Sequence, residues 1–379
     1  MVEVRFLQDR QPEALYPLTV LNRAEELTWG AGSLAEVWHH KGQIQVPHPP
    51  IPGHEIQVLP SLRPSSDTVQ AILEAGPGVE WKRDGIAWAR SIAPGVEATS
   101  TRPVPESWSI LARPQDFFLH AAAAIEDSLG FAQAAWKLRA PELPSHVTLI
   151  GPAENLHVAP DATLTACTLN TTGGPIVIGP GAEVEEGSHI RGPFMLGHGS
   201  TVKMGARIYG PTIIGPHCKV GGEVSNSVLL GYSNKGHDGF LGNSVLGFWC
   251  NLGADTNTSN LKNTYGEVAV FHGASGTIEP SGLQFCGLTM GDHSKCGINT
   301  MFNTGTVVGV GSNIFGGGFP PKHVPSFSWG GADSGWTGHD IEKMISTARA
   351  VMARRNVELS ADAEDRIRKA HAAVSSGVA

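Results

Sequence analysis

Aliphatic side chains recur every six residues over much of this chain. Eight of them follow one another at this spacing without a miss: Ile178, Val184, Ile190, Leu196, Val202, Ile208, Ile214 and Val220. A glycine commonly follows the aliphatic residue, as in Ile178–Gly179 and Ile214–Gly215. An amphipathic helix repeats every 3.6 residues and a half-buried strand every two, so neither element explains this period. The period is typical of a solenoid in which each edge is a short strand followed by a corner.

The same spacing returns further along the chain. A second run is Ile278, Gln284, Met290, Cys296, Phe302, Val308 and Ile314, with one polar member, and a shorter set between the runs is Val228, Asn234, Phe240, Leu246 and Leu252. Three such edges close a triangular coil of about 18 residues, whose strands stack at roughly 4.8 Å. We therefore expect roughly nine coils between about Val147 and Pro320.

The register of six slips at two places. Two surplus residues separate Val220 from Val228, just before the segment GYSNKGHDGF. Two more fall between Leu252 and Ile278, around TNTSNLKNTYGE. Residues added to a solenoid bulge outward as loops, and such loops commonly carry binding residues. The sequence predicts two outward loops here; the alternative is that both are insertions without a function.

The segments on either side of the repeat have a different pattern. Residues 1–112 contain five of the nine tryptophans and lack the period of six. Apolar residues at spacings of three and four predict a helix over residues 114–139. Another predicted helix starts at about Gly338 with Thr337 as its N-cap, and a third starts near Ser360. We expect an N-terminal domain over residues 1–112, a helical linker over 113–146, the repeat over 147–322 and a C-terminal extension over 323–379.

Composition narrows the class of protein. Charged residues make up only 16% of the 379 residues and glycine accounts for 47 of them, which suits a chain of many tight turns. The net charge is −8 and no long basic run occurs, so we expect no nucleic-acid partner. No apolar stretch suits a signal peptide or a membrane-spanning helix, which predicts a cytoplasmic protein without membrane contact. The five cysteines form no C-x-x-C pair, a pattern of reduced thiols.

The most polar part of the repeat, residues 225–267, spans the two register slips. Its segment GHDGFLGNSVLGFWCNLGADT resembles the acetyltransferase domain of the bifunctional N-acetylglucosamine-1-phosphate uridyltransferase/glucosamine-1-phosphate acetyltransferase family. Over about residues 170–331 the chain is more similar to a divergent, Bacteroidetes-type branch of these sugar nucleotidyltransferase-like proteins, through GPIVIG, GYSNKGHDGFLGNSVLG, GLTMGDHSKCGINTMFNTGT and PSFSWGG. The resemblance implies a mainly β fold: a left-handed parallel β-helix of hexapeptide repeats, preceded by a shortened α/β nucleotidyltransferase-like domain and followed by helices.

The resemblance also implies roles for single residues. His237 matches the general base, which removes a proton from an amine as it attacks an acyl thioester. Asn251 matches an active-site asparagine, and Ala254 lies where a backbone N–H meets the acyl carbonyl of the cofactor. Phe240 stands where the family has a tyrosine, so a hydroxyl that would bind sugar or phosphate is missing. Further candidates are Asn234, Lys235, Asp238 and Arg207 for binding the substrate, and Lys262 for binding the cofactor.

Other histidines and cysteines have plainer explanations. Outside its motif, His237 itself would be an ordinary packed or surface histidine, and that is what we expect of His189, His198, His217, His272 and His293. Some β-helical carbonic anhydrases bind zinc through two histidines five residues apart. No pair among these 16 histidines has that spacing, so we predict no metal site. Cys250 and Cys296 lie on or beside repeat positions and are expected to pack in the core.

The N-terminal segment PLTVLNRAEELTWGAGSLAEVW resembles the opening of the same branch, whose first domain is nucleotidyltransferase-like. Such an enzyme has a glycine-rich phosphate loop after its first strand, for which Arg23, Gly30 and Gly32 are poor substitutes. We predict a coenzyme-A-dependent acyl- or acetyltransferase that acts on an amino sugar or sugar phosphate, uses acetyl-CoA and forms a homotrimer. Two alternatives stay open: turnover of a sugar 1-phosphate with a nucleoside triphosphate and Mg²⁺ in the N-terminal domain, and a non-catalytic trimeric scaffold.

Overall fold

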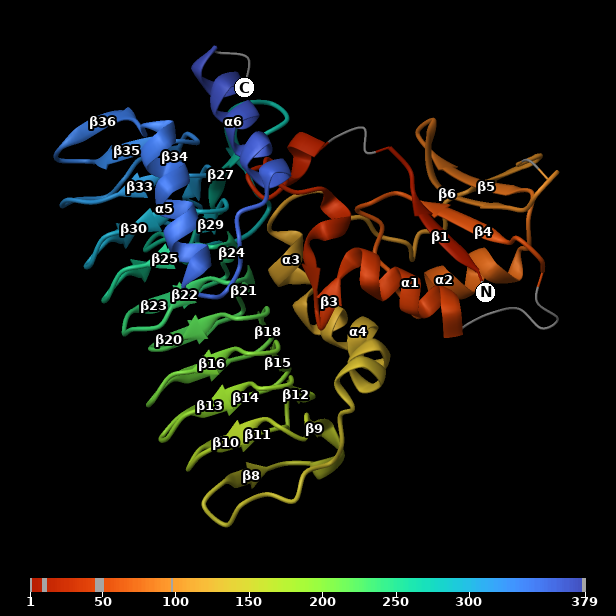
Figure 1. Ribbon diagram of the computed structural model, residues 1–379, viewed down its shortest axis with the longest axis horizontal. Coiled ribbons are helices and arrows are strands. Elements are labelled where there is room, and N and C mark those ends of the chain that lie inside the picture. The colour runs from red at the N-terminus through yellow and green to blue at the C-terminus, as the bar shows by residue number, and fades with distance from the viewer. Residues whose placement is uncertain (1, 9–11, 45–50, 97, 377–379) are drawn as a thin grey trace.

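Most of the chain forms a stack of triangular coils, a parallel β-helix (Figure 1). The structure is a computed structural model and describes residues 2–8, 12–44, 51–96 and 98–376. Each coil contributes short strands to three parallel sheets, which we name the nine-stranded, ten-stranded and six-stranded faces. The nine stacked strands of the first face correspond to the number of coils that the sequence predicts. The predicted mainly β, parallel β-helical fold is confirmed.

The strands of the three faces follow in sequence order up the stack. The nine-stranded face contains β9 (Leu156–Val158), β12 (Ile176–Ile178), β15 (Phe194–Leu196), β18 (Thr212–Ile214), β21 (Val228–Gly231), β24 (Val245–Phe248), β29 (Thr289–Met290), β32 (Val307–Val308) and β34 (His323–Val324). The ten-stranded face contains β10 (Thr163–Leu164), β13 (Glu183–Val184), β16 (Thr201–Val202), β19 (Lys219–Val220), β22 (Asn234–Lys235), β25 (Asn251–Leu252), β30 (Lys295–Cys296), β33 (Asn313–Ile314), β35 (Ser328–Gly331) and the antiparallel β36 (Gly335–Gly338). The six-stranded face contains β8 (Thr148–Ile150), β11 (Thr168–Asn170), β14 (His189–Arg191), β17 (Arg207–Tyr209), β20 (Glu223–Ser225) and β23 (Phe240–Gly242), and the pair β26 (Asn257–Thr258) and β31 (Met301–Phe302) comes after it.

Aliphatic side chains fill the inside of the prism. All eight residues of the first predicted run, from Ile178 to Val220, are at most 2% exposed and belong to one core cluster. The coils pack so closely that some of the glycines after these aliphatic residues leave no room for a side chain. A Cβ on Gly215, for example, would lie 2.1 Å from the carbonyl oxygen of Leu230 in the next coil. The period of six is therefore the distance between successive inward-facing positions.

The first register slip is a shortened coil, so the outward loop predicted there is wrong. Val202 pairs with Val220 eighteen residues later, whereas Val220 pairs with Lys235 only fifteen residues later. The chain turns from β19 into β20 through Gly221 and Gly222, and Gly222 has a φ of 67°, which glycine adopts at little cost. The inward positions that follow are shifted by one residue: Leu229, Lys235 and Leu241 replace the predicted Val228, Asn234 and Phe240.

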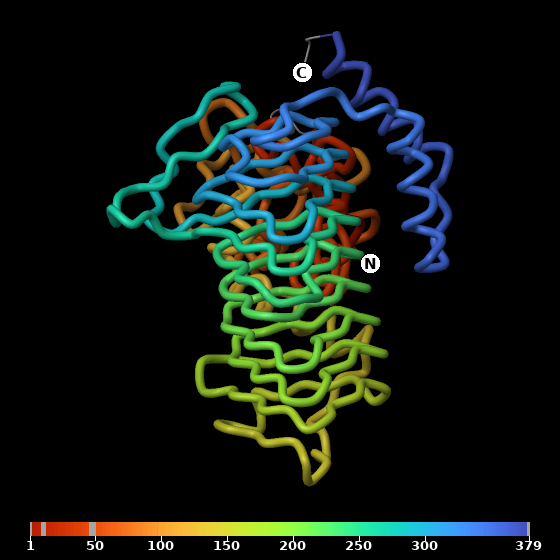
Figure 2. Tube along the Cα trace, turned by 90° about the vertical axis from the view of Figure 1, so that its left-hand side faces the viewer, coloured from red at the N-terminus to blue at the C-terminus, as the bar shows by residue number. Residues whose placement is uncertain are grey.

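The second register slip is an outward insertion, as predicted, but it is larger than two residues. The chain leaves the prism after β26 and returns at β29, and it forms the hairpin of β27 (Ala269–His272) and β28 (Thr277–Pro280) in between. Figure 2 shows this insertion projecting from the side of the stack. Ile278 is 51% exposed in the hairpin and Gln284 is also exposed, so neither belongs to the core. The rest of the second predicted run, from Met290 to Ile314, is buried there.

The N-terminal region forms a mixed sheet beside the prism (Figure 1). Its strands lie in the order β1, β4, β6, β5, β7, and the β1/β4 and β5/β7 pairs are parallel. The elements are β1 (Glu3–Phe6), the 3-10 helices η1 (Pro12–Leu15) and η2 (Ala24–Glu26), the hairpin of β2 (Thr28–Trp29) and β3 (Gly32–Ser33), α1 (Leu34–Ile44), β4 (Glu55–Val58), α2 (Ser66–Glu74), β5 (Val79–Arg83), β6 (Ile86–Ile92) and β7 (Ser100–Pro103). Strands and helices alternate here, and a kinship with nucleotidyltransferases stays a prediction.

A helical segment joins this region to the prism. The helix predicted over residues 114–139 is two helices, α3 (Asp116–Leu119) and α4 (Ala121–Trp136), separated by His120, and the 3-10 helix η3 (Ala153–Asn155) comes later. α4 and the N-terminal region pack on outward-facing residues of the nine-stranded face, namely Val177, Met195, Ile213, Val228, Leu230 and Val245. That face is consequently buried on both sides.

Two C-terminal helices cover the edge between the nine-stranded and ten-stranded faces. α5 (Ile341–Ala353) and α6 (Ala361–Ser375) pack around Trp249 and Phe327. The helix predicted to start near Ser360 is confirmed as α6, and Ser360 caps it, since its hydroxyl accepts the N–H of Ala363. The N-cap predicted at Thr337 is wrong: Thr337 lies in β36, and Asp340 caps α5 because its side chain reaches an N–H of the first turn. None of the described helices is long and apolar enough to cross a membrane.

The described helices do not cover the opposite edge of the prism. It runs between the ten-stranded and six-stranded faces, and we name it the outer edge. It consists of the corner residues 203–205, 221–222, 236–239, 253–255 and 297–299 of successive coils. Its exposed side chains include Met204, His237, Asp238, Asp255 and Ile298.

Candidate functional site

His237 lies on the outer edge with its imidazole exposed. It belongs to the corner between β22 and β23, in the coil that follows the shortened one. Asp238 beside it is also exposed, and its carbonyl oxygen accepts the N–H of Asp255 in the next coil at 3.1 Å. The structure therefore places the predicted base, His237, and the predicted substrate ligand, Asp238, at one accessible corner.

Lys235 lies inside the prism, which contradicts its predicted role in binding the substrate. Its side chain is about as buried as the aliphatic residues above and below it, with 2% of the residue exposed. The ammonium donates hydrogen bonds to the carbonyl oxygens of Gly221, at 2.9 Å, and of His237, at 2.5 Å. Burial lowers the pKa of Lys235 to about 8, although the nearby carboxylates of Asp238 and Asp255 act in the opposite direction. Lys235 thus holds the backbone of two successive corners from within.

The shortened coil brings those two corners close together. A Cβ on Gly222 would lie 2.9 Å from the carbonyl oxygen of His237 and 2.8 Å from that of Gly239. The backbone of the His237 corner consequently rests on a glycine that has no side chain to push it away. This role of Gly221 and Gly222 does not follow from the period of six. Two adjacent glycines in place of two residues of an edge were the signal that could have revealed it.

Ala254 lies on the outer edge one coil above His237. Its carbonyl oxygen accepts the N–H of Asn299 at 2.8 Å. Among the described residues, no hydrogen bond takes up the N–H of Ala254. An unpaired corner N–H can donate to the oxygen of an acyl carbonyl, as the predicted role requires.

Asn234 and Asn251 face outward on the ten-stranded face, in the strands that lead into the corners of His237 and Ala254. They are register partners in neighbouring coils, so their side chains lie side by side. The Oδ1 of Asn234 accepts a hydrogen bond from Arg355, just after α5, at 3.0 Å. Asn251 is half-buried. Asn251 precedes Ala254 by three residues in the same coil. The side chain of Asn234 already has a hydrogen-bond partner, Arg355, within the chain.

Phe240 and Arg207 lie on the other side of the outer edge. Arg207, Glu223 and Phe240 are register partners on three successive strands of the six-stranded face. The exposed Arg207 pairs with Glu223 at 3.5 Å, and Phe240 is half-buried. Lys262 is in the insertion, where its ammonium donates to the carbonyl oxygen of Glu267. The structure thus brings Arg207 and Phe240 to the outer edge and places Lys262 in a separate segment.

Several of the histidines expected to be ordinary residues pack along one edge of the prism, and the cysteines are buried. His198, His217, Tyr232, Trp249 and His293 form a line of ring contacts along the helix-covered edge, with centroids 4.1 to 6.3 Å apart. Burial lowers the pKa of His293 to about 3, so it is neutral. All five cysteines are buried and free, including Cys250 and Cys296. Within the described residues, no group of three or more His, Cys, Asp or Glu side chains is placed to hold a metal ion.

The turn around Gly30 in the N-terminal region packs against α4. A Cβ on Gly30 would lie 2.0 Å from Oγ of Ser128, and the N–H of Ala31 donates to that same oxygen at 3.0 Å. A phosphate loop needs free backbone N–H groups that point at the ligand. In this turn the N–H of Ala31 is bonded to Ser128, and α4 lies where a phosphate would bind.

No family model matches the chain, and no curated protein sequence matches it. Solved structures similar to it include the polySia-specific acetyltransferase NeuO, at 12% identity over 56% of this chain and 99% of that chain, with a TM-score of 0.32. Another is Arabidopsis UDP-N-acetylglucosamine acyltransferase, at 15% identity over 52% and 76%, with a TM-score of 0.24. A third is the N-acyltransferase AntD from Bacillus cereus in complex with dTDP and 3-hydroxybutyryl-CoA, at 9% identity over 55% and 91%, with a TM-score of 0.23. At these identities and TM-scores the similarities do not assign a reaction to this chain.

Proposed function

We propose that this chain is an acyltransferase that moves an acyl group, such as acetyl, from a coenzyme A thioester to an amino sugar or an amino sugar phosphate. The observation that supports this most is the outer edge itself. An exposed imidazole, His237, and an unpaired backbone N–H, that of Ala254, occur there in adjacent coils. Acyl transfer to an amine needs these two groups, a base for the proton and a donor for the carbonyl oxygen.

The reaction proceeds by direct attack on the thioester. The amine nitrogen forms a bond to the acyl carbon while His237 accepts the proton that the nitrogen loses. The N–H of Ala254 stabilises the negative charge that develops on the carbonyl oxygen. The carbon–sulfur bond then breaks, and the coenzyme A thiolate takes up a proton. Asn251, close to Ala254 along the same coil, would orient the substrate through its amide group.

Phe240 and Arg207 affect which acceptor the site can bind. Phe240 offers an apolar ring where a tyrosine hydroxyl would bind the sugar or its phosphate. Arg207, two strands below it, has an exposed guanidinium whose only described carboxylate partner, Glu223, is at 3.5 Å on the surface. Surface pairs of this kind are weak, so Arg207 is free to bind a phosphate instead. The acceptor is therefore an amino sugar with an anionic group, and not necessarily glucosamine 1-phosphate.

The site is completed by a second copy of the chain. A corner of a prism is convex, so a substrate on the outer edge needs walls from elsewhere. Met204 and Ile298, which are 68% and 70% exposed, lie below and above His237 on that edge. These two apolar side chains are available for contact with a neighbouring subunit. We therefore propose the homotrimer, in which each outer edge meets a neighbouring subunit, and the five buried free thiols suit a reducing cytoplasm.

The test is the release of free coenzyme A from acetyl-CoA in the presence of a panel of amino sugars and their phosphates. Thiol release that depends on the acceptor is the expected result. Pyrophosphate release from UTP and a sugar 1-phosphate, in a parallel assay, would instead support nucleotidyl transfer in the N-terminal region. Activity in neither assay would favour a non-catalytic scaffold over both.

A further inference from the structure

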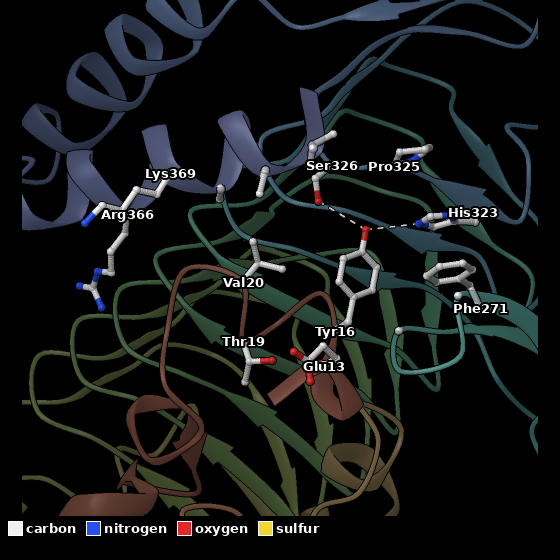
Figure 3. Close-up of a pocket in the computed structure, with 15 residues that line it drawn as sticks. Glu13, Tyr16, Thr19, Val20, Phe271, His323, Pro325, Ser326, Arg366 and Lys369 are labelled. Atoms are coloured by element: carbon white, nitrogen blue, oxygen red, sulfur yellow. Dashed lines mark hydrogen bonds between the residues drawn. The ribbon is translucent and has the colours of Figure 1, made fainter. Parts of the chain in front are cut away.

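A large cavity lies where three segments outside the regular repeat meet the last coils (Figure 3). Its volume is about 760 Å³, within the range of small-molecule sites. One wall comes from the segment after η1, a second from the hairpin of β27 and β28, and a third from the end of the nine-stranded face. α6 forms the roof. None of the residues assigned to the outer edge lines this cavity.

Three hydrogen-bonding side chains converge at the floor of the cavity. The hydroxyl of Tyr16 lies 3.2 Å from Nε2 of His323 and 3.4 Å from Oγ of Ser326, as Figure 3 shows. The ring of His323 stacks on Phe271 at a centroid distance of 3.5 Å and an angle of 5°. These groups come from the turn after η1, from the insertion, and from β34 and the residues that follow it, so the fold assembles them from distant parts of the chain.

The floor carries no charge at neutral pH. Burial lowers the pKa of His323 to about 4, so its imidazole is neutral, and burial also raises the pKa of Tyr16, so its hydroxyl stays protonated. A charged group would lose its hydration there without gaining a partner of opposite charge. A hydroxyl or carbonyl oxygen, in contrast, can exchange hydrogen bonds with Tyr16.

The walls are apolar, and the mouth carries charges of both signs, the cations of Arg366 and Lys369 and the carboxylate of Glu13. Val20, Pro325 and Phe271 line the walls, and Ala370, Ala373 and Val374 of α6 line the roof. Arg366 and Lys369 of α6 lie at one side, away from Glu13 (Figure 3). Lys369 pairs with Asp365, and Arg366 pairs with Glu26 and Asp362. Because these pairs are on the surface, an anionic group of a ligand can replace a carboxylate.

We propose that this cavity is a binding site for an amphiphilic anion: an apolar chain that carries a hydroxyl or carbonyl group at its inner end and a carboxylate or phosphate at its outer end. The inner oxygen bonds to Tyr16, the chain contacts the apolar walls, and the anionic group lies beside Lys369 and Arg366. The proposal is independent of acyl transfer on the outer edge.

The helix that forms the roof is suited to admit such a ligand. Ile367 is the one fully buried hydrophobic residue among the described residues of α6. Two further cavities lie beneath the same helix, one beside Ala363 and one beside His371. Few apolar contacts make an element easy to displace locally. Ligand binding should therefore order α6 rather than require the core to open.

The test compares three probes by titration calorimetry: 12-hydroxydodecanoate, dodecanoate and dodecyltrimethylammonium. We expect saturable binding of 12-hydroxydodecanoate with one site per chain, weaker binding of dodecanoate, and at least tenfold weaker binding of the cation. Tyr16→Phe should abolish the preference for the hydroxylated chain, since that hydrogen bond contributes about three- to tenfold in affinity.

A matched pair of variants on α6 assigns the binding to this cavity. Ala373→Trp fills the cavity beneath the helix and should weaken binding at least tenfold, whereas Ala372→Trp, on the exposed side, should bind as the wild type does. Ala373→Leu serves as a smaller obstruction if a melting curve shows that the tryptophan variant is unfolded. Equal affinity of the two positions, tighter binding of the cation, or no saturable binding would overturn the proposal.

Discussion

Lys235 and His237 are two residues apart and have opposite surroundings. The lysine points into the prism, 2% exposed, and holds the carbonyl oxygen of the histidine from the inside. The imidazole of His237 points to solvent on the outer edge. The lysine is therefore a positioning residue for the corner, and only the histidine is available to a substrate. From the sequence, both were predicted to contact the substrate.

The first expectation concerns the role of His237 as a base. His237→Ala should lower the turnover number about 10²- to 10⁴-fold with whichever acceptor the wild type uses, because proton removal by a positioned base contributes about that much. The Michaelis constant for acetyl-CoA should change little, since the imidazole contacts the amine. Steady-state kinetics with both substrates varied measures these two effects separately.

His189→Ala is the matched control for that variant. His189 is exposed on the six-stranded face of the same prism, so its loss removes an imidazole without touching the outer edge. His293 is unsuitable as a control, because it is buried and part of the ring line beneath the C-terminal helices. Equal turnover by His237→Ala and the wild type would remove the assignment of the base.

A second expectation follows from the buried ammonium of Lys235. Burial lowers its pKa from the ordinary value of 10.5 to about 8. Between those two pH values the unfolded chain still binds a proton that the folded chain has released. The free energy of unfolding should therefore rise with pH across this window, because burying the ammonium costs stability below it.

Lys235→Met separates this effect from those of other lysines. The variant keeps a long apolar side chain and has no ammonium, so its free energy of unfolding should lack this part of the rise. Urea unfolding of both proteins at pH values below, within and above the window measures the difference. Parallel pH curves for the two proteins would show that the lysine is not the source.

At the level of elements, the period of six was sufficient to predict the coils but not their register. A hydrophobic residue followed by glycine marks an inward position only while every edge keeps six residues. After Gly221 and Gly222 shorten one edge, the inward position passes from Val228 to Leu229, and both are apolar and buried. The pattern therefore could not distinguish them, and a lysine occupies an inward position that no hydrophobic pattern predicts.

The insertion and the helix starts show a second limit. Ile278 continued the spacing of six by chance, yet it lies in an exposed antiparallel hairpin. The helix start near Ser360 could be predicted because a serine at the start of a helical pattern is a strong signal. Thr337 gave a similar signal, but its strand pairs with β35 through Trp329, so the sheet took precedence and Asp340 became the cap.

The stacked strands also determine how the thiols should react. The five cysteines are buried, and burial raises the pKa of Cys167 to about 11 and that of Cys218 and Cys286 to about 12. Only thiolates attack disulfide reagents, so none of the five should react with an aromatic disulfide in the native protein at pH 8. All five should react in urea.

Ile44→Cys provides the positive control for that measurement, because position 44 is 62% exposed on α1, away from the proposed contact between subunits. The new thiol should react within the time of mixing with a moderate excess of reagent, while the native five stay protected. Rapid reaction of a native cysteine would show that the coil containing it opens readily.

For the whole molecule, the decisive question is which surfaces of the prism are covered. The strands of the nine-stranded face read as continuous apolar runs, such as Ile176–Ile178, because one side faces the core and the other faces α4. Continuous apolar strands indicate burial on both sides. This signal in the sequence could have predicted where the N-terminal region packs. It could not reveal the Tyr16 cavity, whose walls depend on the positions of three separate segments.

The arrangement of the N-terminal region predicts weak nucleotide binding. The turn at Gly30 packs on Ser128 of α4 and has no free cradle of N–H groups. We expect no saturable binding of UTP with Mg²⁺ in calorimetry at concentrations where sugar nucleotidyltransferases are saturated. Tight binding would contradict this and would promote nucleotidyl transfer to the leading function.

The last expectation concerns the assembly through the outer edge. Met204 and Ile298 are 68% and 70% exposed on either side of His237 and Ala254. Burial of these side chains between subunits would stabilise a trimer and would also form a wall of the site. The wild type should sediment as a trimer at micromolar concentration. Met204→Glu combined with Ile298→Glu should yield monomers with turnover reduced at least tenfold, because two carboxylates would be buried at each contact. Ile44→Glu introduces the same charge at a residue that is 62% exposed on α1, far from this edge in the chain, and should leave the trimer intact. A monomeric wild type, or a double variant that still sediments as a trimer, would show that the outer edge is not the interface.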